Sequence, residues 1–184
     1  IKLKYPQFDL INTKFESKND FSFNINDKFK VKNLALSSNI SINNSQLKRN
    51  NLINKNFIEI NEFIDLKDHK IKASYANKEL SIEGKGQVKF QNKFEFIDYK
   101  LKNNGSNLNL VSNLELKDLD IKNQNLIKEY LPDTKDTLIL KDHKIEINYQ
   151  DNILSLDGLG KVKLEKKLNQ IKYFFSTKDK KYNF

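Results

Sequence analysis

The sequence lacks cysteine, methionine and tryptophan, and its 184 residues include two prolines and five glycines. Without cysteine the chain can form neither a disulfide nor a thiolate metal site. No run of about 18 apolar residues is present, so we expect neither a membrane-spanning helix nor a secretory leader within these residues. Because the chain starts at Ile1 and contains no methionine, we interpret it as a fragment or processed product of a longer protein.

Arginine is almost absent as well, since Arg49 is the only one, although the formal net charge is +9. A basic balance is typical of proteins that bind nucleic acid or an anionic membrane. The guanidinium group, however, is the usual reader of phosphate and guanine. The lysines also alternate with apolar residues, as they do on the solvated face of a strand. We therefore predict that this chain binds no nucleic acid.

What the sequence does contain is an internal repeat. Leu66 to Phe90 aligns without a gap with Leu140 to Leu164, at a constant offset of 74 (143 minus 69), and 13 of the 25 aligned positions are identical. Several of the other positions exchange similar residues, such as Ile82 for Leu156. A duplicated unit of this kind predicts an array of stacked repeats.

Within the repeat, apolar residues alternate with polar ones, which is the signature of a half-buried strand. The alternating set in the first copy is Leu80, Ile82, Gly84, Gly86, Val88 and Phe90, and the second copy keeps the same spacing. Polar turns at 76–78 and 150–152 precede these strands. Two glycines at equivalent positions in both copies indicate a bend, a bulge or the close approach of another strand.

The alternation extends the repeat to Leu34–Phe90 and Leu108–Leu164. We expect incoming strands over residues 1–33, a first unit over 34–107 and a second over 108–164. Residues 165–184 are interpreted as the start of a further, truncated unit, because Ile171, Tyr173 and Phe175 alternate again.

One segment in each unit has helical rather than alternating spacing. Residues 121–130 place four apolar side chains near one helical face, and Pro132 stops the pattern. The equivalent segment lies near residues 46–54. The predicted fold is mostly β: an elongated, twisted, largely antiparallel repeat sheet, forming a groove or an open sandwich, with one short helix per unit of about 74 residues.

The histidines, His69 and His143, occupy equivalent positions in the repeat. A pair of bases or metal ligands is one interpretation, but no third ligand is spaced near either residue. Asp68 and Asp142 precede them, and adjacent residues of a strand point to opposite faces, which argues against a catalytic dyad. We favour a polar residue that was duplicated with its unit, and we predict no metal site.

Other polar motifs point away from catalysis. Glu83 and Asp157 are equivalent carboxylates, but their spacing places them on the solvent side of the strands. The stretch 84–86 reads Gly-Lys-Gly but lacks the strand–loop–helix context of a phosphate loop. We predict no catalytic residues, no cofactor and no enzymatic activity.

From Gly84 the sequence reads GKGQVKFQNKFEFIDYKLKNNGSNLNLVSNLELKDLDI. It resembles the AsmA-like proteins of Gram-negative envelopes, in particular their YhdP-like branch. The shared pattern is a strand ending in Gly-x-Gly, an alternating apolar strand, a turn rich in Asn or Gly, and a strand leading to a short helix. The similarity covers most of residues 34–164.

This resemblance implies a segment of a periplasmic β-groove, within a parent protein that is anchored in the inner membrane by other parts of its chain. Such a segment would conduct phospholipid acyl chains between the inner and outer membranes, in the service of outer-membrane biogenesis. The residues expected to line the groove are the alternating apolar sets: Leu80, Ile82, Val88, Phe90, Phe94, Phe96, Leu108, Leu110, Leu114, Leu116, Leu154, Leu156, Val162 and Leu164.

Two other interpretations stay open. The first is a structural or adhesive β-repeat with a closed core and no ligand, which predicts the same alternation. The second is a jelly roll of the kind that carries lipopolysaccharide, whose repeat is typically shorter than the one found in this chain.

Overall fold

The computed structural model describes residues 10–48, 63–122, 137–164, 167–177 and 181–183, and all regular structure within these ranges is β-strand. Alternating sequences rich in Ile, Val, Phe and Tyr favour strands because their side chains pack well on a pleated surface. The strands are β1 (Leu10–Ile25), β2 (Val31–Lys48), β3 (Phe63–Ala76), β4 (Glu79–Lys89), β5 (Phe94–Asn103), β6 (Leu108–Lys122), β7 (Thr137–Gln150), β8 (Ile153–Leu164), β9 (Lys167–Ser176) and β10 (Lys181–Asn183).

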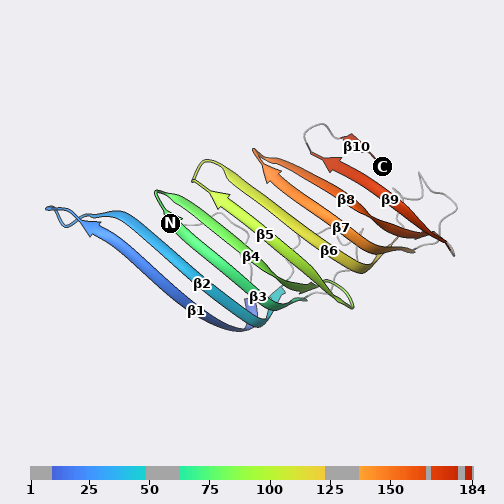
Figure 1. Cartoon of the computed structure of the whole chain (residues 1–184), viewed down its shortest axis with the longest axis horizontal. Coiled ribbons are helices and arrows are strands. Elements are labelled where there is room, and N and C mark those ends of the chain that lie inside the picture. Colours follow the sequence, from blue (N-terminus) through green and yellow to red (C-terminus); the bar gives the residue numbers. More distant parts are fainter. Residues whose placement is uncertain (1–9, 49–62, 123–136, 165–166, 178–180, 184) are drawn as a thin grey trace.

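The ten strands form one sheet in which spatial order follows chain order, and each strand runs antiparallel to the next. Figure 1 shows this meander, with β1 at one edge and β10 at the other. Within the described residues the sheet is open, since no pairing joins β1 to the strands of the far edge. The prediction of a mostly β, largely antiparallel sheet is confirmed.

Tight turns join the strands that are closest in sequence. Asn77 and Lys78 between β3 and β4 both have positive φ, 52° and 65°, as do Asp151 and Asn152 between β7 and β8. Two positive-φ residues are typical of the hairpin turn whose twist matches that of its strands. The sequence repeat therefore recurs in the backbone conformation of the turns.

Each unit also contains a β-bulge in the strand that carries the histidine. Between Lys67 and Lys70, β3 has one residue more than β4, and Asp68 adopts a φ of 52°. The extra residue reverses the alternation, so that Leu66 and Ile71 lie on the same face although they are five positions apart. In β7, Asp142 has a φ of 53° and the register shifts at the equivalent place.

The reversal continues into the neighbouring strand. Leu116 and Leu119 of β6 are three residues apart, yet both belong to one buried cluster. The register between β6 and β7 is the same on both sides of this region, with Leu116 opposite His143 and Asp118 opposite Lys141. The side-chain alternation of β6 and that of β7 therefore shift at the same level of the sheet. The cluster contains Ile64, Val88, Leu114, Leu116, Leu119 and Ile145.

The short helix expected in each unit falls mostly outside the described residues. The parts that the structure does describe, Gln46–Lys48 and Ile121–Lys122, belong to strands β2 and β6.

The alternating residues around Tyr173 were expected to begin a further unit. Instead β9 pairs with β8 as β5 pairs with β4, with Tyr173 opposite Gly158 as Tyr99 is opposite Gly84. These residues therefore form the last strand of the second unit.

The β3–β4 turn offers a test of the backbone conformation. Lys78 has a φ of 65°, which strains a residue that carries a Cβ atom, whereas glycine adopts it freely. Lys78→Gly should therefore raise the free energy of unfolding, by about 0.5–1 kcal/mol, as measured by urea titration. Lys78→Ala is the matched control and should bring no such gain. A loss of stability in the glycine variant would contradict the assigned turn.

Candidate functional site: the apolar face of the sheet

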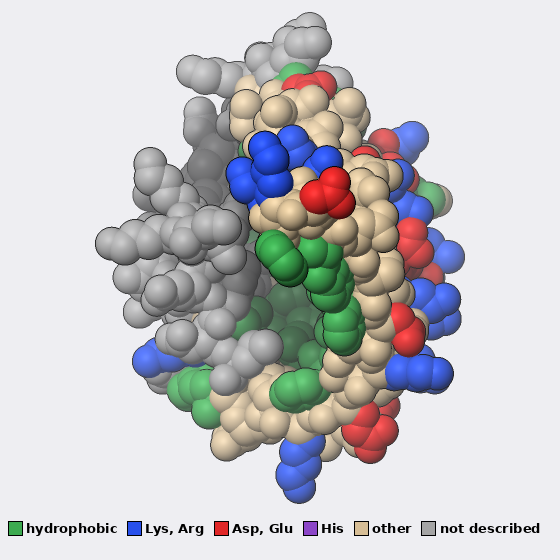
Figure 2. Space-filling model, turned by 90° about the vertical axis from the view of Figure 1, so that its left-hand side faces the viewer, with side chains coloured by type: hydrophobic (Ala, Val, Ile, Leu, Met, Phe, Trp, Pro, Cys, Tyr) green, Lys and Arg blue, Asp and Glu red, His purple; other side chains and the backbone are tan. Residues whose placement is uncertain are grey.

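The alternation and the register place most apolar side chains on one side of the sheet, called here the apolar face. One row of this face crosses five strands through directly opposed partners: Ala73, Ile82, Leu101, Leu110 and Tyr149. Figure 2, which looks at the molecule from the β1 side of Figure 1, shows hydrophobic side chains gathered in a hollow and charged side chains on the opposite side.

Burial changes along this face. Val88, Leu116 and Val162 are buried, whereas Leu80, Ile82 and Leu156 nearer the hairpin turns are half-buried. At the β1 edge the apolar side chains are open to solvent: Phe21 is 71% exposed, and its ring stacks on Phe23 with the centroids 6.3 Å apart. Phe15, opposite Ile42, is 63% exposed. The apolar face therefore passes from a packed core to an exposed surface.

The structure brings eleven of the fourteen predicted groove residues onto this one face. They are Leu80, Ile82, Val88, Phe90, Leu108, Leu110, Leu114, Leu116, Leu154, Leu156 and Val162. Leu164 ends β8, and its side chain lies outside the described residues.

Phe94 and Phe96 lie on the other side, called here the polar face, so their placement with the groove residues was wrong. Phe94 is directly opposite Lys89 and Phe96 opposite Gln87, both of which alternate with Val88. The ammonium groups of Lys67 and Lys89 lie 5.6 and 5.9 Å from the centroid of the Phe94 ring. Cation–π attraction and the lysine stems therefore accommodate this ring on the polar side.

The residue between them, Glu95, faces the apolar side and is only 2% exposed. Its carboxylate accepts hydrogen bonds from the backbone N–H groups of Lys117, at 2.7 Å, and Asp118, at 3.4 Å. These N–H groups belong to the segment where β6 changes step and the regular ladder is interrupted. A buried polar group must be paired. These hydrogen bonds satisfy both the Glu95 carboxylate and the two backbone N–H groups, so the carboxylate can lie on the apolar face at little cost in free energy.

Each histidine packs against a glycine of the neighbouring strand. A Cβ atom built on Gly86 would lie 2.5 Å from Cγ and Cδ2 of His69, and the ring of His143 covers Gly160 in the same way. The other glycine of each pair is covered by a tyrosine: Tyr99 lies over Gly84 and Tyr173 over Gly158. The paired glycines therefore mark close approach by side chains, whereas the sequence predicted a bend, a bulge or the approach of a strand.

Hydrogen bonds fix the orientation of the buried histidines. Nε2 of His143 donates to the carbonyl oxygen of Lys161 at 2.9 Å, and Nε2 of His69 donates to that of Gln87 at the same distance. With the proton of that hydrogen bond on Nε2, Nδ1 accepts from the hydroxyl of Tyr173, 3.1 Å away. Both carbonyls lie beside the bulge, so each imidazole completes the hydrogen bonding of the distorted ladder.

The electrostatic environment agrees with a structural role. Burial lowers the pKa of His69, against the opposing effects of the Gln87 carbonyl and the Asp68 charge. Burial, aided by the charge of Asp157, raises the pKa of Tyr173 to about 12. In the part of the chain that the structure describes, no group of three His, Asp or Glu side chains is arranged to hold a metal ion.

The carboxylates Glu83 and Asp157 lie on the exposed polar face. The glycine–lysine–glycine stretch lies within β4. No described helix has the length and apolar character needed to cross a membrane.

The bulge was missed in the sequence, although a signal was present. Leu66 has an even number and Ile71 an odd one, so the alternation changes step across the stretch Lys67–Lys70. The same change recurs between Leu140 and Ile145. A shift that is repeated at the same place in both units is typical of a bulge.

Comparisons with protein-family models, with curated proteins and with solved structures found nothing that matches this chain.

The contact between His69 and Gly86 can be tested with a double-mutant cycle. Gly86→Ala should lower the free energy of unfolding by about 1–3 kcal/mol, because the new methyl group overpacks the ring. In a His69→Ala background the same substitution should cost less, because two of the three nearest atoms, Cγ and Cδ2 of the ring, are removed and the backbone Cα at 2.8 Å remains. Additive effects in urea titrations would contradict this contact.

The low pKa of His69 predicts a pH dependence of stability. The folded-state pKa lies below the unfolded value of about 6.5, so below that pH the unfolded chain binds more protons. This contribution is complete above about pH 6.5 and is lost as the pH falls towards the folded-state pKa. Urea titrations at pH 7.5 and 5.0 should show a smaller loss for His69→Gln, which retains a donor for Gln87, than for the original chain. Equal losses would refute the prediction.

Proposed function

We propose that this chain is a segment of a β-groove whose apolar face binds phospholipid acyl chains and conducts them between two membranes. The observation that supports this most is the solvent exposure of large apolar side chains on that face, with Phe21 71% and Leu36 43% exposed. A contiguous exposed apolar surface is typical of a site that binds a lipid or another apolar partner.

The extent of the apolar face suits a long apolar ligand. Ten strands spaced about 4.8 Å apart give roughly 43 Å across the sheet. Each buried methylene contributes about 0.8 kcal/mol, so an acyl chain on this face would recover most of what it loses on leaving a bilayer. Because the second unit repeats the first, successive positions are alike and movement between them would be nearly isoenergetic.

The finer features expected from the resemblance to the AsmA-like family belong to the same proposal. They are one short helix per unit and a periplasmic position in a parent protein anchored in the inner membrane. The proposed segment is not an enzyme and uses no cofactor.

A structural β-repeat without a ligand is the second candidate. It is favoured by the packed cluster around Leu116, which is only 3% exposed and shows that part of the apolar face is an ordinary core. The two candidates differ at the hairpin and β1 ends of the face, where apolar side chains are half-buried or exposed.

Lipid binding can be tested by native mass spectrometry of the chain after incubation with phospholipid vesicles. Ile82→Asp combined with Leu156→Asp places charges on the apolar face and should lower the bound phospholipid at least tenfold, because each charge must be desolvated under the acyl chain. The matched control is Ser81→Asp with Ser155→Asp, whose side chains lie next in sequence but on the polar face.

A second variant guards against loss of folding. Phe15 and Phe21 are exposed, so Phe15→Asp with Phe21→Asp should leave the far-ultraviolet circular dichroism spectrum unchanged while reducing lipid binding. If the original chain binds no phospholipid, or binds it equally in all variants, the proposal fails and the closed structural repeat is favoured.

A further inference from the structure

The charge of the polar face changes along one level of the sheet, from the first repeat unit to the second. One row of directly opposed residues crosses this face from β3 to β8, and it reads Lys70, Lys85, Asp98, Asn113, Glu146 and Asp157. The row begins with two facing lysines and ends with two facing carboxylates.

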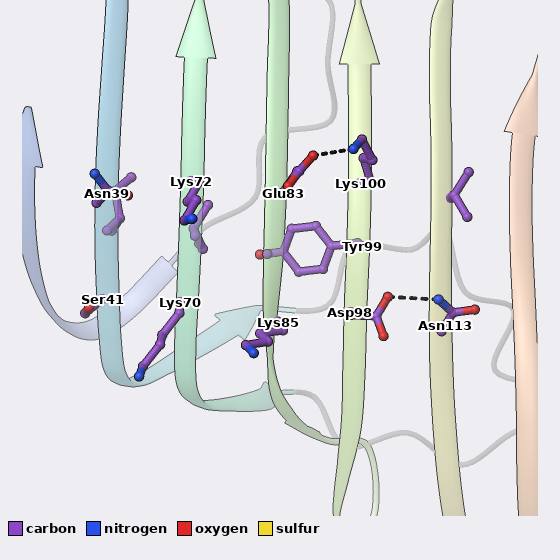
Figure 3. A pocket seen from close by; sticks show the side chains of 14 residues that line it. Asn39, Ser41, Lys70, Lys72, Glu83, Lys85, Asp98, Tyr99, Lys100 and Asn113 are labelled. Carbon is purple, nitrogen blue, oxygen red and sulfur yellow. Dashed lines mark hydrogen bonds and ion pairs between the residues drawn. The ribbon is translucent and has the colours of Figure 1, made fainter. Parts of the chain in front are cut away.

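The basic patch is defined by Lys70, Lys72, Lys85 and Lys100, on β3, β4 and β5. These residues border a cavity of about 720 Å³ on the polar side. Figure 3 shows them on adjacent strands, with Lys100 paired to Glu83. Among the described residues the other three lysines form no ion pair. Lys100 lowers the pKa of Glu83, so this carboxylate stays ionised. With Asp98, which lies opposite Lys85, it makes two negative charges among four lysines at this cavity.

The acidic patch is defined by Glu115, Glu146 and Asp157, on β6, β7 and β8, and it borders a second cavity. Lys144 lies 3.9 Å from Glu115 and is the one described cation that lines this cavity. Glu146 accepts a hydrogen bond from Asn148 at 2.7 Å. No described cation forms an ion pair with Glu146 or Asp157.

The difference between the patches is not a consequence of the repeat. At equivalent repeat positions, Lys72 corresponds to Glu146, Lys85 to Leu159 and Lys100 to Phe174. Lys70 and Glu83 keep their charge, as Lys144 and Asp157. The apolar face, by contrast, keeps its residue types, as Ile82 and Leu156 illustrate. The units are thus alike on the apolar face, whereas three of the four lysine positions of the basic patch carry no positive charge in the second unit.

Each patch is unfavourable in an isolated chain. Like charges directly opposite each other in an antiparallel pair are destabilising, and this applies both to Lys70 with Lys85 and to Glu146 with Asp157. A partner of opposite charge would relieve the repulsion. One chain carries both patches, so a second copy can relieve both.

We propose that the polar face binds a second copy of this chain, with the basic patch of each copy on the acidic patch of the other. A two-fold axis parallel to the strands, between β5 and β6, places β4 of one copy over β7 of its partner and β3 over β8. Lys85 then faces the Glu146 position and Lys70 the Asp157 position. Such an isologous contact closes as a dimer.

Alternative partners suit this face less well. An anionic membrane or a nucleic acid would be attracted by the basic patch and repelled by Glu146 and Asp157, about three strand spacings away, or roughly 15 Å. The proposed contact also leaves the apolar face free, so it does not depend on lipid binding. Because the charged groups are exposed, we expect a weak association that falls as salt rises.

The test is sedimentation velocity at 50 mM and 500 mM NaCl, with reciprocal charge reversals. Lys70→Glu with Lys85→Glu makes both patches acidic, and Glu146→Lys with Asp157→Lys makes both basic. Each variant alone should be monomeric at low salt, with association weakened at least tenfold. An equimolar mixture of the two should associate again, since each then offers what the other lacks.

The matched control for net charge is Lys28→Glu with Lys30→Glu, in the exposed turn between β1 and β2, which should still dimerise. Circular dichroism spectra should establish that every variant is folded. A chain that is monomeric at 50 mM NaCl, variants that still associate alone, or a mixture that stays monomeric would each overturn the proposal.

Discussion

This structure depends on the alternation of side chains along each strand. The bulge at Asp68, repeated at Asp142, keeps the apolar side chains of a long strand on one face. Without the extra residue, Leu66 and Ile71 would point to opposite sides, and half of β3 would present its apolar residues to the wrong face. The alternation of β6, which pairs with β7, shifts as well, so that Leu116 and Leu119 both lie in the core. A regular strand of 14 or 15 residues with these sequences could not build one continuous apolar face.

The bulge has a chemical consequence that explains the histidines. An interrupted ladder leaves backbone groups to be satisfied, and the imidazole of each unit donates to a carbonyl beside the bulge. The ring needs space on the apolar face, and the glycine opposite provides it. Aspartate, histidine, glycine and tyrosine thus recur together because they form one local solution, which is sufficient to explain their duplication without catalysis.

The two faces of the sheet are subject to different constraints. On the apolar face, equivalent positions keep equivalent residues, because the face must remain continuous from one unit to the next. On the polar face, the packing constrains side chains little, and along the row from Lys70 to Asp157 the charge changes from positive to negative between the units. The lipid binding proposed for one face and the association proposed for the other are therefore compatible in a single sheet.

The periodicity of apolar residues and the offset of the repeat can be seen along the chain itself. They were enough to predict the repeat, the strand-rich fold, the polar turns and eleven of the fourteen residues proposed for the apolar face. The face on which Phe94 and Phe96 lie could not be predicted in this way. It depends on how β5 pairs with β4, where Glu95 rather than a phenylalanine is opposite Val88. The burial of the histidines and the row of opposed charges were likewise decided only in the folded sheet. Both depend on register across strands, and register is a relation between residues far apart in sequence.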